Sequence, residues 1–235
     1  MPIPQRGYKY LDFVMVAYVV VLLCSNLIGP AKAATLELPF FGNVIFGAGV
    51  LFFPISYIFG DILTEVYGYA QSRRVIWSGF TALLFASLMA SIIVALPPAP
   101  GWENQKVYEI AFGNTWRIAG ASMIAYFCGE FVNSYVLARM KVYSKGEFMR
   151  TRFVTSTIAG EAVDSSIFYP MAFWDSGIMP NDLVLTLALS QFVTKTLVEI
   201  PFLPLTTRFV KALKKREEED YFDTHTNFNP FKLGS

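Results

Sequence analysis

Charged and amide side chains interrupt four apolar stretches of this sequence at intervals of three or four residues. They are Asp61 and Glu65; Glu130 and Asn133; Glu161 and Asp164; and Gln191, Lys195 and Glu199. Residues at these intervals share one face of a helix. Each of the four helices would present a polar stripe, and the four stripes can be satisfied together only around an interior cavity.

These side chains offer acceptors to a ligand that carries N–H donors. One lysine, Lys195, cannot neutralise all the carboxylates, so some of them must be protonated, bound to polar partners or left for a ligand. The alternative is that the residues form structural ion pairs. That alternative weighs most for Asp61 and Glu65, which lie close to Arg73 and Arg74 in the sequence.

Two of the stripes share a short sequence pattern. Residues 129–134 read Gly-Glu-Phe-Val-Asn-Ser, and residues 160–165, 31 positions later, read Gly-Glu-Ala-Val-Asp-Ser. Because consecutive membrane spans run in opposite directions, the two segments would face each other antiparallel near the midplane, as in transporters whose site lies between related helices. The small residues would equally suit close packing of two helices.

Several catalytic chemistries have no residues to support them. The only histidine, His225, lies near the C-terminus, which leaves no Ser–His pair, His-based metal site or His proton relay in the apolar stretches. No phosphate-binding glycine loop is present, so the chain does not itself hydrolyse ATP. We therefore expect neither an enzyme nor a bound cofactor or metal. An intramembrane aspartyl protease that uses Asp61 and Asp164 remains as an alternative.

The composition is that of a membrane protein. Of the 235 residues, 54% are hydrophobic and 16% are charged, whereas a soluble domain carries about 25% charged residues. Apolar windows predict six membrane-spanning helices, over residues 11–28, 44–67, 75–96, 118–137, 153–174 and 183–209. We expect an all-α integral membrane protein, with a six-helix transport domain over residues 1–213 and a charged cytoplasmic tail, solvated and partly disordered, over residues 214–235.

Basic residues predict the orientation of these helices. Fifteen of the 19 Lys and Arg residues fall on one side of the six-span arrangement, and Lys32, Lys106 and Arg117 fall on the other. By the positive-inside rule, the N-terminus and the C-terminus both face the cytoplasm. Between the third and fourth spans, residues 107–116 are expected to form a short helix that lies in the membrane interface.

The motifs together resemble those of a known transporter family. They are Phe53-Pro54-Ile55-Ser56-Tyr57 with Asp61, Glu65 and Arg73-Arg74; Gly129-Glu130 with Asn133 and Arg139-Met140-Lys141; and Ser156-Thr157, Gly160-Glu161, Asp164 and Phe168. Over about residues 26–204 the chain resembles the queuosine precursor transporters, also named the vitamin uptake transporter family. The resemblance implies a multi-pass protein of the bacterial inner membrane that imports the 7-deazaguanines preQ0 and preQ1 for salvage into tRNA modification.

The resemblance also implies the partners. They are a small purine-like substrate and the lipid bilayer, without nucleic acid, and a monomer and a homodimer remain open. Transport would proceed by alternating access around a midplane site. A ligand-binding subunit of a multi-component importer remains as a second alternative.

A guanine-like base fits the chemistry of the polar stripes. Its edge offers N1–H and an exocyclic amine, two parallel donors that one carboxylate accepts together, and an O6 acceptor that Lys, Asn or Gln can meet. We expect Glu130 and Glu161 to bind this edge, and Lys195 to meet O6 or to hold a carboxylate. The whole expected substrate-binding set is Asn26, at the entrance, with Asp61, Glu65, Glu130, Asn133, Glu161, Asp164, Gln191, Lys195 and Glu199.

Overall fold

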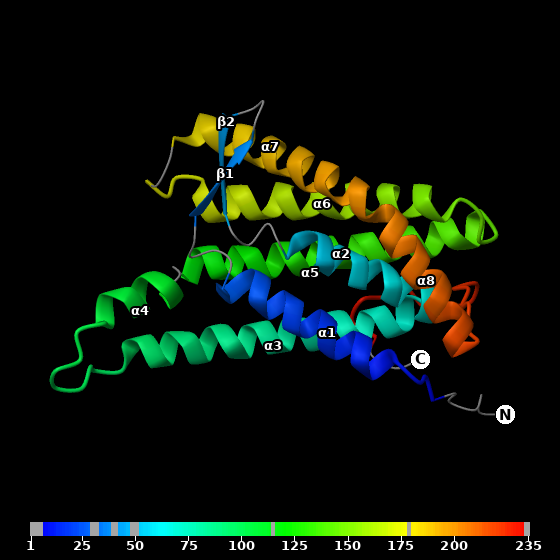
Figure 1. Cartoon of the computed structure of the whole chain (residues 1–235), viewed down its shortest axis with the longest axis horizontal. Coiled ribbons are helices and arrows are strands. Elements are labelled where there is room, and N and C mark those ends of the chain that lie inside the picture. The colour runs from blue at the N-terminus through cyan, green and yellow to red at the C-terminus, as the bar shows by residue number, and fades with distance from the viewer. Residues whose placement is uncertain are drawn as a thin grey trace.

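The computed structural model describes residues 7–28, 33–38, 42–47, 52–113, 116–177 and 180–232. Its longer helices run side by side along the longest axis of the molecule (Figure 1). In chain order the helices are α1 (Leu11–Leu23), α2 (Phe53–Ile62), α3 (Tyr69–Ala95), α4 (Gln105–Phe112), α5 (Trp116–Tyr143), α6 (Met149–Phe173), α7 (Asn181–Glu199) and α8 (Leu203–Glu217). The π-helical turns η1 (Cys24–Ile28) and η3 (Leu63–Tyr67) extend α1 and α2, and the 3₁₀ turn η4 (Ile200–Phe202) joins α7 to α8.

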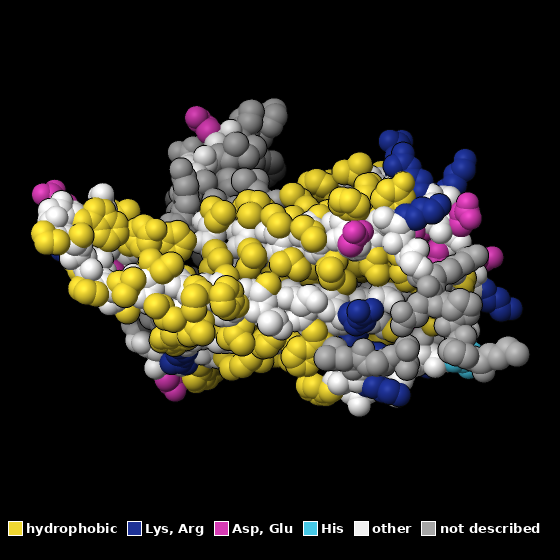
Figure 2. All heavy atoms as spheres, turned by 90° about the horizontal axis from the view of Figure 1, so that it is seen from below, with side chains coloured by type: hydrophobic (Ala, Val, Ile, Leu, Met, Phe, Trp, Pro, Cys, Tyr) yellow, Lys and Arg dark blue, Asp and Glu magenta, His cyan; other side chains and the backbone are white. Residues whose placement is uncertain are grey.

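The surface of the bundle is apolar over much of its length (Figure 2). Phe13 in α1, Phe85 in α3 and Leu189 in α7 are between 62% and 71% exposed. Among the described helical segments, three are long and apolar enough to cross a membrane, namely Leu11–Ile28, Tyr69–Ala95 and Asn181–Glu217. The chain is therefore a membrane protein, because apolar surface of this extent is stable only against lipid or another protein.

The second predicted span begins later than the sequence pattern indicates. Residues 44–47 belong to the strand β2 (Gly42–Gly47), which pairs antiparallel with β1 (Ala33–Leu38). The helix begins only at Phe53, so the predicted start at residue 44 is wrong. A short apolar run with β-branched residues fits a strand as well as a helix, and here the backbone is satisfied by strand pairing.

The other predicted spans each coincide with helix. Residues 75–96 fall in α3, 118–137 in α5, 153–174 largely in α6 and 183–209 in the α7–α8 segment. This last segment is interrupted at η4, where Pro201 lacks the N–H that a helix needs. A short helix is present where an interfacial one was predicted over residues 107–116: α4 begins at Gln105, ends at Phe112 and lies beside the end of α3 (Figure 1).

Basic side chains gather at one end of the bundle, which we name the basic end; the opposite end is the α4 end (Figure 2). The start of α1 and the end of α8 meet at the basic end (Figure 1). There the Glu217 carboxylate accepts the backbone N–H groups of Lys9 and Tyr10, at 2.8 and 2.7 Å, and the Tyr67 hydroxyl at 2.7 Å. One carboxylate thus joins the first helix, η3 and the last helix.

The region after residue 214 is ordered and contacts the bundle, so the prediction of a partly disordered tail is wrong, although most of its described side chains are exposed. Helix α8 continues to Glu217, and residues 218–232, which we name the C-terminal segment, lie against η3 and α3. Asp223 is 2% exposed and accepts the Tyr69 backbone N–H with both oxygens at 3.1 Å. Arg73 donates to the backbone carbonyls of Asn227 at 2.7 Å and Asn229 at 2.9 Å.

The physical reason lies at the start of α3. The first N–H groups of a helix have no acceptor within the helix, and a buried arginine needs several acceptors. Asp223 and the carbonyls of the C-terminal segment supply both, and the Phe228 ring packs on Tyr69 with 4.9 Å between ring centroids. Bonding to the bundle therefore explains Asp223, whereas Glu218 and Lys232 of the same segment are exposed.

Candidate functional site

The two Gly-Glu motifs face each other where α5 packs on α6, as the sequence predicts. A Cβ atom on Gly129 would lie 3.0 Å from the carbonyl oxygen of Gly160, and a Cβ atom on Gly160 would lie 2.9 Å from that of Gly129. The contact is reciprocal, and any larger residue at either position would push the two backbones apart. It brings Glu130 and Glu161, the next residues of the two motifs, to the same level of the bundle.

Lys195 of α7 holds two carboxylates of α6. Its Nζ lies 3.1 Å from Oε2 of Glu161 and 2.8 Å from Oδ2 of Asp164. The sequence left the partner of Lys195 open among Glu130, Glu161 and Glu199; the structure pairs it with Glu161 and also with Asp164, which was not among these candidates. Gln191 lies one helical turn before Lys195 and is half-buried. A buried lysine between two carboxylates stabilises both, so this group is a fixed polar centre between α6 and α7.

Asp61 of α2 lies beside Glu130 and Asn133 of α5. A Cβ atom on Gly60 would lie 3.1 Å from Oε2 of Glu130 and 3.7 Å from Nδ2 of Asn133, so the two side chains reach the backbone of α2. Asp61 and Asn133 are each 1% exposed. Three buried side chains have polar atoms without a hydrogen-bond partner among the described residues. These atoms are both oxygens of Asp61, both amide atoms of Asn133 and Oε2 of Glu130. Unsatisfied buried polar atoms are rare in native proteins, and a polar ligand or a proton would satisfy them.

Glu199, near the end of α7, reaches the same interior. It is 5% exposed and accepts the Thr157 hydroxyl of α6 at 3.0 Å. Its carboxyl group interacts electrostatically with those of Glu161 and Asp61. The stripes of α2, α5, α6 and α7 therefore converge, as the sequence predicts.

Two tyrosines that the sequence analysis did not single out as a pair complete this interior. The Tyr18 hydroxyl of α1 lies 2.8 Å from the Tyr126 hydroxyl of α5, and Tyr18 is within hydrogen-bonding reach of Glu130. Apart from Asp12 in its first turn, the helix that carries Tyr18 is apolar, and no periodic polar pattern marks this residue. Tyr126 of α5 could have been found from the sequence, because its hydroxyl group lies four residues before Glu130 of the first Gly-Glu motif.

Glu65 lies apart from this interior, in a cluster of ions at the basic end. Its Oε1 lies 2.7 Å from both Arg152 and Lys214, and 3.8 Å from Lys141. Asp220 of the C-terminal segment lies 2.5 Å from Lys141 and 2.6 Å from Lys214. Burial raises the pKa of Asp220, but hydrogen bonds from the two ammonium groups outweigh burial and hold this pKa below its usual value. Glu65 thus forms structural ion pairs, as the alternative held, but with other partners than Arg73 and Arg74, and the cluster closes the basic end. No ion pair of Asp61 is present among the described residues.

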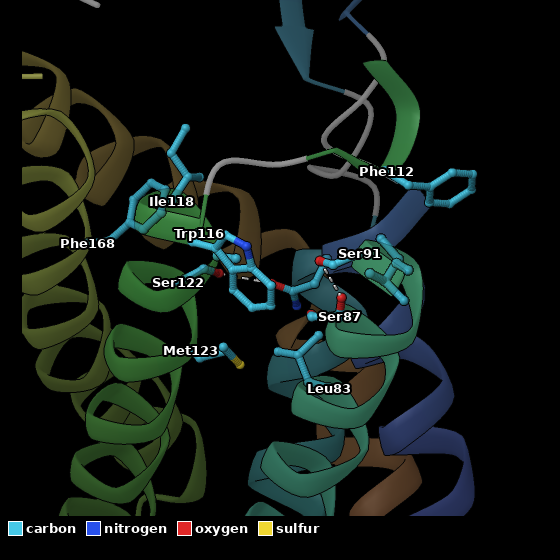
Figure 3. A pocket seen from close by; sticks show the side chains of 13 residues that line it. Leu83, Ser87, Ser91, Phe112, Trp116, Ile118, Ser122, Met123 and Phe168 are labelled. Carbon is cyan, nitrogen blue, oxygen red and sulfur yellow. Dashed lines mark hydrogen bonds between the residues drawn. The ribbon is translucent and has the colours of Figure 1, made fainter. Parts of the chain in front are cut away.

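A cavity of about 130 Å³ lies toward the α4 end, separate from the carboxylates (Figure 3). Trp116 and Ser122 of α5, Phe168 of α6 and Asn26 of η1 contribute to its wall. Asn26 accepts the Ser122 hydroxyl at 3.0 Å and donates to the carbonyl of Leu22 at 2.9 Å. An apolar cavity of about 150 Å³ is known to accept benzene. The cavity at the α4 end is somewhat smaller than that, and Phe168 connects its wall to Asp164 one turn earlier on α6.

The predicted pairing of Asp61 and Asp164 in an aspartyl protease finds no support in the described contacts. Asp164 is held by Lys195, whereas Asp61 faces Glu130 and Glu199. Among the described residues, no group of three or more His, Cys, Asp or Glu side chains has the geometry to hold a metal ion.

Comparison with known proteins identifies the family. The sequence profile of the vitamin uptake transporter family matches residues 47–209, more than half of the chain. The chain belongs to this family. The matched region extends from the end of β2 into α8 and contains every carboxylate of the converging stripes. The resemblance drawn from the motifs is thereby confirmed.

Relatives in two bacteria carry transporter names. A Bacillus subtilis (strain 168) protein named "Probable queuosine precursor transporter" is 29% identical over 180 residues, which are 76% of this chain and 73% of that protein. The Escherichia coli (strain K12) "Queuosine precursor transporter" is 26% identical over 218 residues, which are 90% of this chain and 91% of that protein. No solved structure matches the chain. Membership of the vitamin uptake transporter family and the names of these relatives thus identify this protein as a transporter and not an enzyme.

Proposed function

We propose that this chain imports queuosine precursors, 7-deazaguanine bases such as preQ0 and preQ1, across the bacterial inner membrane. The names of the Bacillus subtilis and Escherichia coli relatives support the substrate class. The apolar helices support the location, and the buried polar interior supports a solute that carries several hydrogen-bonding groups.

The reciprocal contact of the two Gly-Glu motifs carries the proposal. It holds Glu130 and Glu161 on facing helices, and each keeps an oxygen without a hydrogen bond among the described residues. A carboxylate accepts N1–H and the exocyclic amine of a guanine-like edge together. The amide of Asn133, with Gln191 beyond it and the Lys195 ammonium beside Glu161, supplies partners for O6 and the ring nitrogens.

The expected site residues divide into groups. Glu130, Asn133 and Glu161 bind the base edge, and Lys195 with Asp164 positions Glu161. Asn26 and the cavity at the α4 end form the way in. Glu65 closes the basic end, and Asp61 with Glu199 lies outside the base-binding group.

We further propose that six helical segments cross the membrane with both chain termini in the cytoplasm. They are α1 with η1, α2 with η3, α3, α5, α6, and α7 with α8. The cavity then opens toward the outside, and the Glu65 ion cluster closes the cytoplasmic side. A cavity open to the outside and a closed cytoplasmic side suit the outward-facing state of an alternating-access cycle. The helices would pivot about the Gly129–Gly160 contact during this cycle.

Substitution of the motif glutamates tests the binding role. Glu130→Gln or Glu161→Gln sets an N–H against a ligand N–H, which should cost about 2 to 4 kcal/mol, or roughly thirty- to a thousandfold in affinity for preQ0. At least one of the two variants should show this loss by calorimetry while the purified protein stays monodisperse. Glu103→Gln, a change of the same chemistry at an exposed position, is the matched control and should bind as the unmodified chain does.

Two outcomes would contradict the proposal. If both motif variants bind preQ0 with unchanged affinity, these carboxylates do not bind the base edge. If the purified chain binds neither preQ0 nor preQ1, the substrate class is wrong. Uptake by the chain alone in liposomes would also exclude the alternative of a subunit that depends on an energising partner.

A further inference from the structure

Asp61 is a buried carboxyl group that no described cation reaches. It is 1% exposed, and both of its oxygens lack a hydrogen bond. Its charged neighbours are the carboxyl groups of Glu199, Glu130 and Glu65. The amide of Asn133 lies beside Asp61 within hydrogen-bonding reach, but its geometry falls short of a full hydrogen bond. Burial without a hydrogen-bond partner or a nearby cation opposes an ionised Asp61, and so do the carboxyl groups of Glu199 and Glu130, whereas Glu65 is already paired with cations.

The cations near this interior are bound by other carboxylates. Lys195 lies between Glu161 and Asp164, and Arg152 lies 2.7 Å from Glu65. Lysines of α5 and α8 also contact Glu65. Because these carboxylates already use the positive charge, none remains nearby to neutralise Asp61 in the described part of the chain.

Titratable groups face the Asp61 region from each helix packed around it. They are Tyr18 of α1, Glu65 of η3, Tyr126, Glu130 and Lys141 of α5, Arg152, Glu161 and Asp164 of α6, Lys195 and Glu199 of α7, and Lys214 of α8. The positive members of this set are three lysines and Arg152, and each of them is paired with a carboxylate. Protonation of the region therefore depends on how far water reaches into it, which is what changes when a transporter opens.

We propose that uptake is driven by protons and that Asp61 carries the coupling proton; this rests on the proposed function. The proton binds the Asp61 carboxylate when the site is reached from the α4 end. It leaves into the cytoplasm when the basic end opens. One proton and one base cross in the same direction, and the only bond made and broken is the O–H bond of the acid.

The ion cluster at the basic end explains why release occurs there. Opening that end separates Glu65 from its cations and admits water next to Asp61, which lies one helical turn away. Water and uncovered positive charge both stabilise an ionised carboxylate. Proton affinity thus differs between the two conformations, and linkage requires that a proton gradient bias the conformational change.

The geometry favours a proton over a metal cation. Metal binding needs several oxygen ligands gathered around one point, and the described carboxyl groups do not form such a group. A proton needs only one carboxyl oxygen, and here Asp61 offers two without partners. A sodium-driven mechanism is a separate outcome of the test below.

Accumulation of preQ0 by proteoliposomes that contain the full chain tests this proposal. With the outside one pH unit more acidic, one proton per base supports up to about tenfold accumulation. A proton ionophore should abolish that accumulation, and a sodium gradient should not replace the pH difference. Asp61→Asn keeps the shape of the neutral acid but cannot release a proton, so it should exchange preQ0 across the membrane without accumulating it.

The matched control is Asp182→Asn, the same change at an exposed position of α7, which should accumulate preQ0 as the unmodified chain does. A second measurement needs no variant: preQ0 entry should acidify the lumen, read with a trapped pH dye. This keeps the test decisive if Asp61→Asn fails to fold.

Four results would overturn the proposal. They are accumulation that survives the ionophore, accumulation driven by sodium, no acidification of the lumen during uptake, and gradient-driven accumulation by Asp61→Asn. A monodisperse Asp61→Asn protein that no longer binds preQ0 would place Asp61 among the substrate ligands instead. Absence of preQ0 and preQ1 binding by the unmodified chain is the failure of the proposed function, and binding is measured first so that the two failures are told apart.

Discussion

Replacement of Gly160 by alanine should separate α5 from α6 and weaken the protein. The added methyl group would lie 2.9 Å from both the Gly129 carbonyl oxygen and the Asn133 Cβ. Ordinary contacts of a Cβ atom are 3.4 to 4 Å. One of the two obstructing groups is backbone, so relief requires movement of a whole helix by about half an ångström or more.

The magnitude follows from two opposing effects. Overpacking of this kind costs about 1 to 3 kcal/mol. Alanine in place of glycine within a helix gains about 1 kcal/mol. Gly120→Ala isolates the second effect, because Gly120 lies on α5 with nothing within 4 Å of an added Cβ. The difference between the two variants is the overpacking cost alone, equivalent to roughly 2 to 12 °C in Tm at about 2 to 4 °C per kcal/mol for a chain of this size.

Thermal unfolding in detergent measures this difference. Gly160→Ala should unfold at a lower temperature than Gly120→Ala, and it should also bind preQ0 more weakly because Asn133 is displaced. Equal unfolding temperatures for the two alanine variants would refute the reasoning, since they would show that the α5–α6 contact tolerates an extra methyl group at its closest point.

Three further predictions concern charge. Lys195→Met strands the buried Glu161 and the partly buried Asp164 and should lower the free energy of unfolding by about 3 to 5 kcal/mol. Asp164→Asn in a double variant should restore part of the loss, and no rescue would argue against this pairing. In a chain without its two native cysteines, a cysteine that replaces Lys106 should react with a membrane-impermeant thiol reagent in intact cells, and one that replaces Lys145 should not. Labelling at position 145 would contradict the proposed orientation. Asp220→Asn should lower the free energy of unfolding by no more than about 1 kcal/mol, because the Asp220 side chain is 49% exposed. It should nevertheless speed proteolysis of the C-terminal segment, and an unchanged cleavage rate would show that this ion pair does not hold the segment.

The features that could be predicted from the sequence follow from the membrane itself. A helix in lipid must bond its own backbone and cover itself with apolar residues, so hydropathy locates α1, α3 and the α7–α8 segment. A charged residue in such a helix needs a partner, so the two stripes that carry Glu161 and Lys195 predict a contact in the interior. The repeated Gly-Glu motif predicts the facing of α5 and α6 because small residues with one spacing allow two backbones to approach.

The features that could not be predicted depend on contacts far apart in the chain. The strand Gly42–Gly47 forms because a partner strand lies nearby, and hydropathy does not reveal a partner. Asp164 and Glu161 both lie within one turn of each other, and only the rotation of α7 decides that Lys195 reaches both. The C-terminal segment is ordered by acceptor needs at the start of α3, over 140 residues earlier, which local composition does not encode.

Glu217 has a consequence for the order of events during biosynthesis. Its carboxylate binds the backbone at the start of the first helix, but Glu217 itself is synthesised only after helices α1 to α7. The basic end therefore stays unsealed while these helices insert, and it closes only once α8 has been made. A chain that terminates early would keep unpaired groups on Lys9 and Tyr10 exposed, which gives membrane quality control a direct way to recognise an unfinished product.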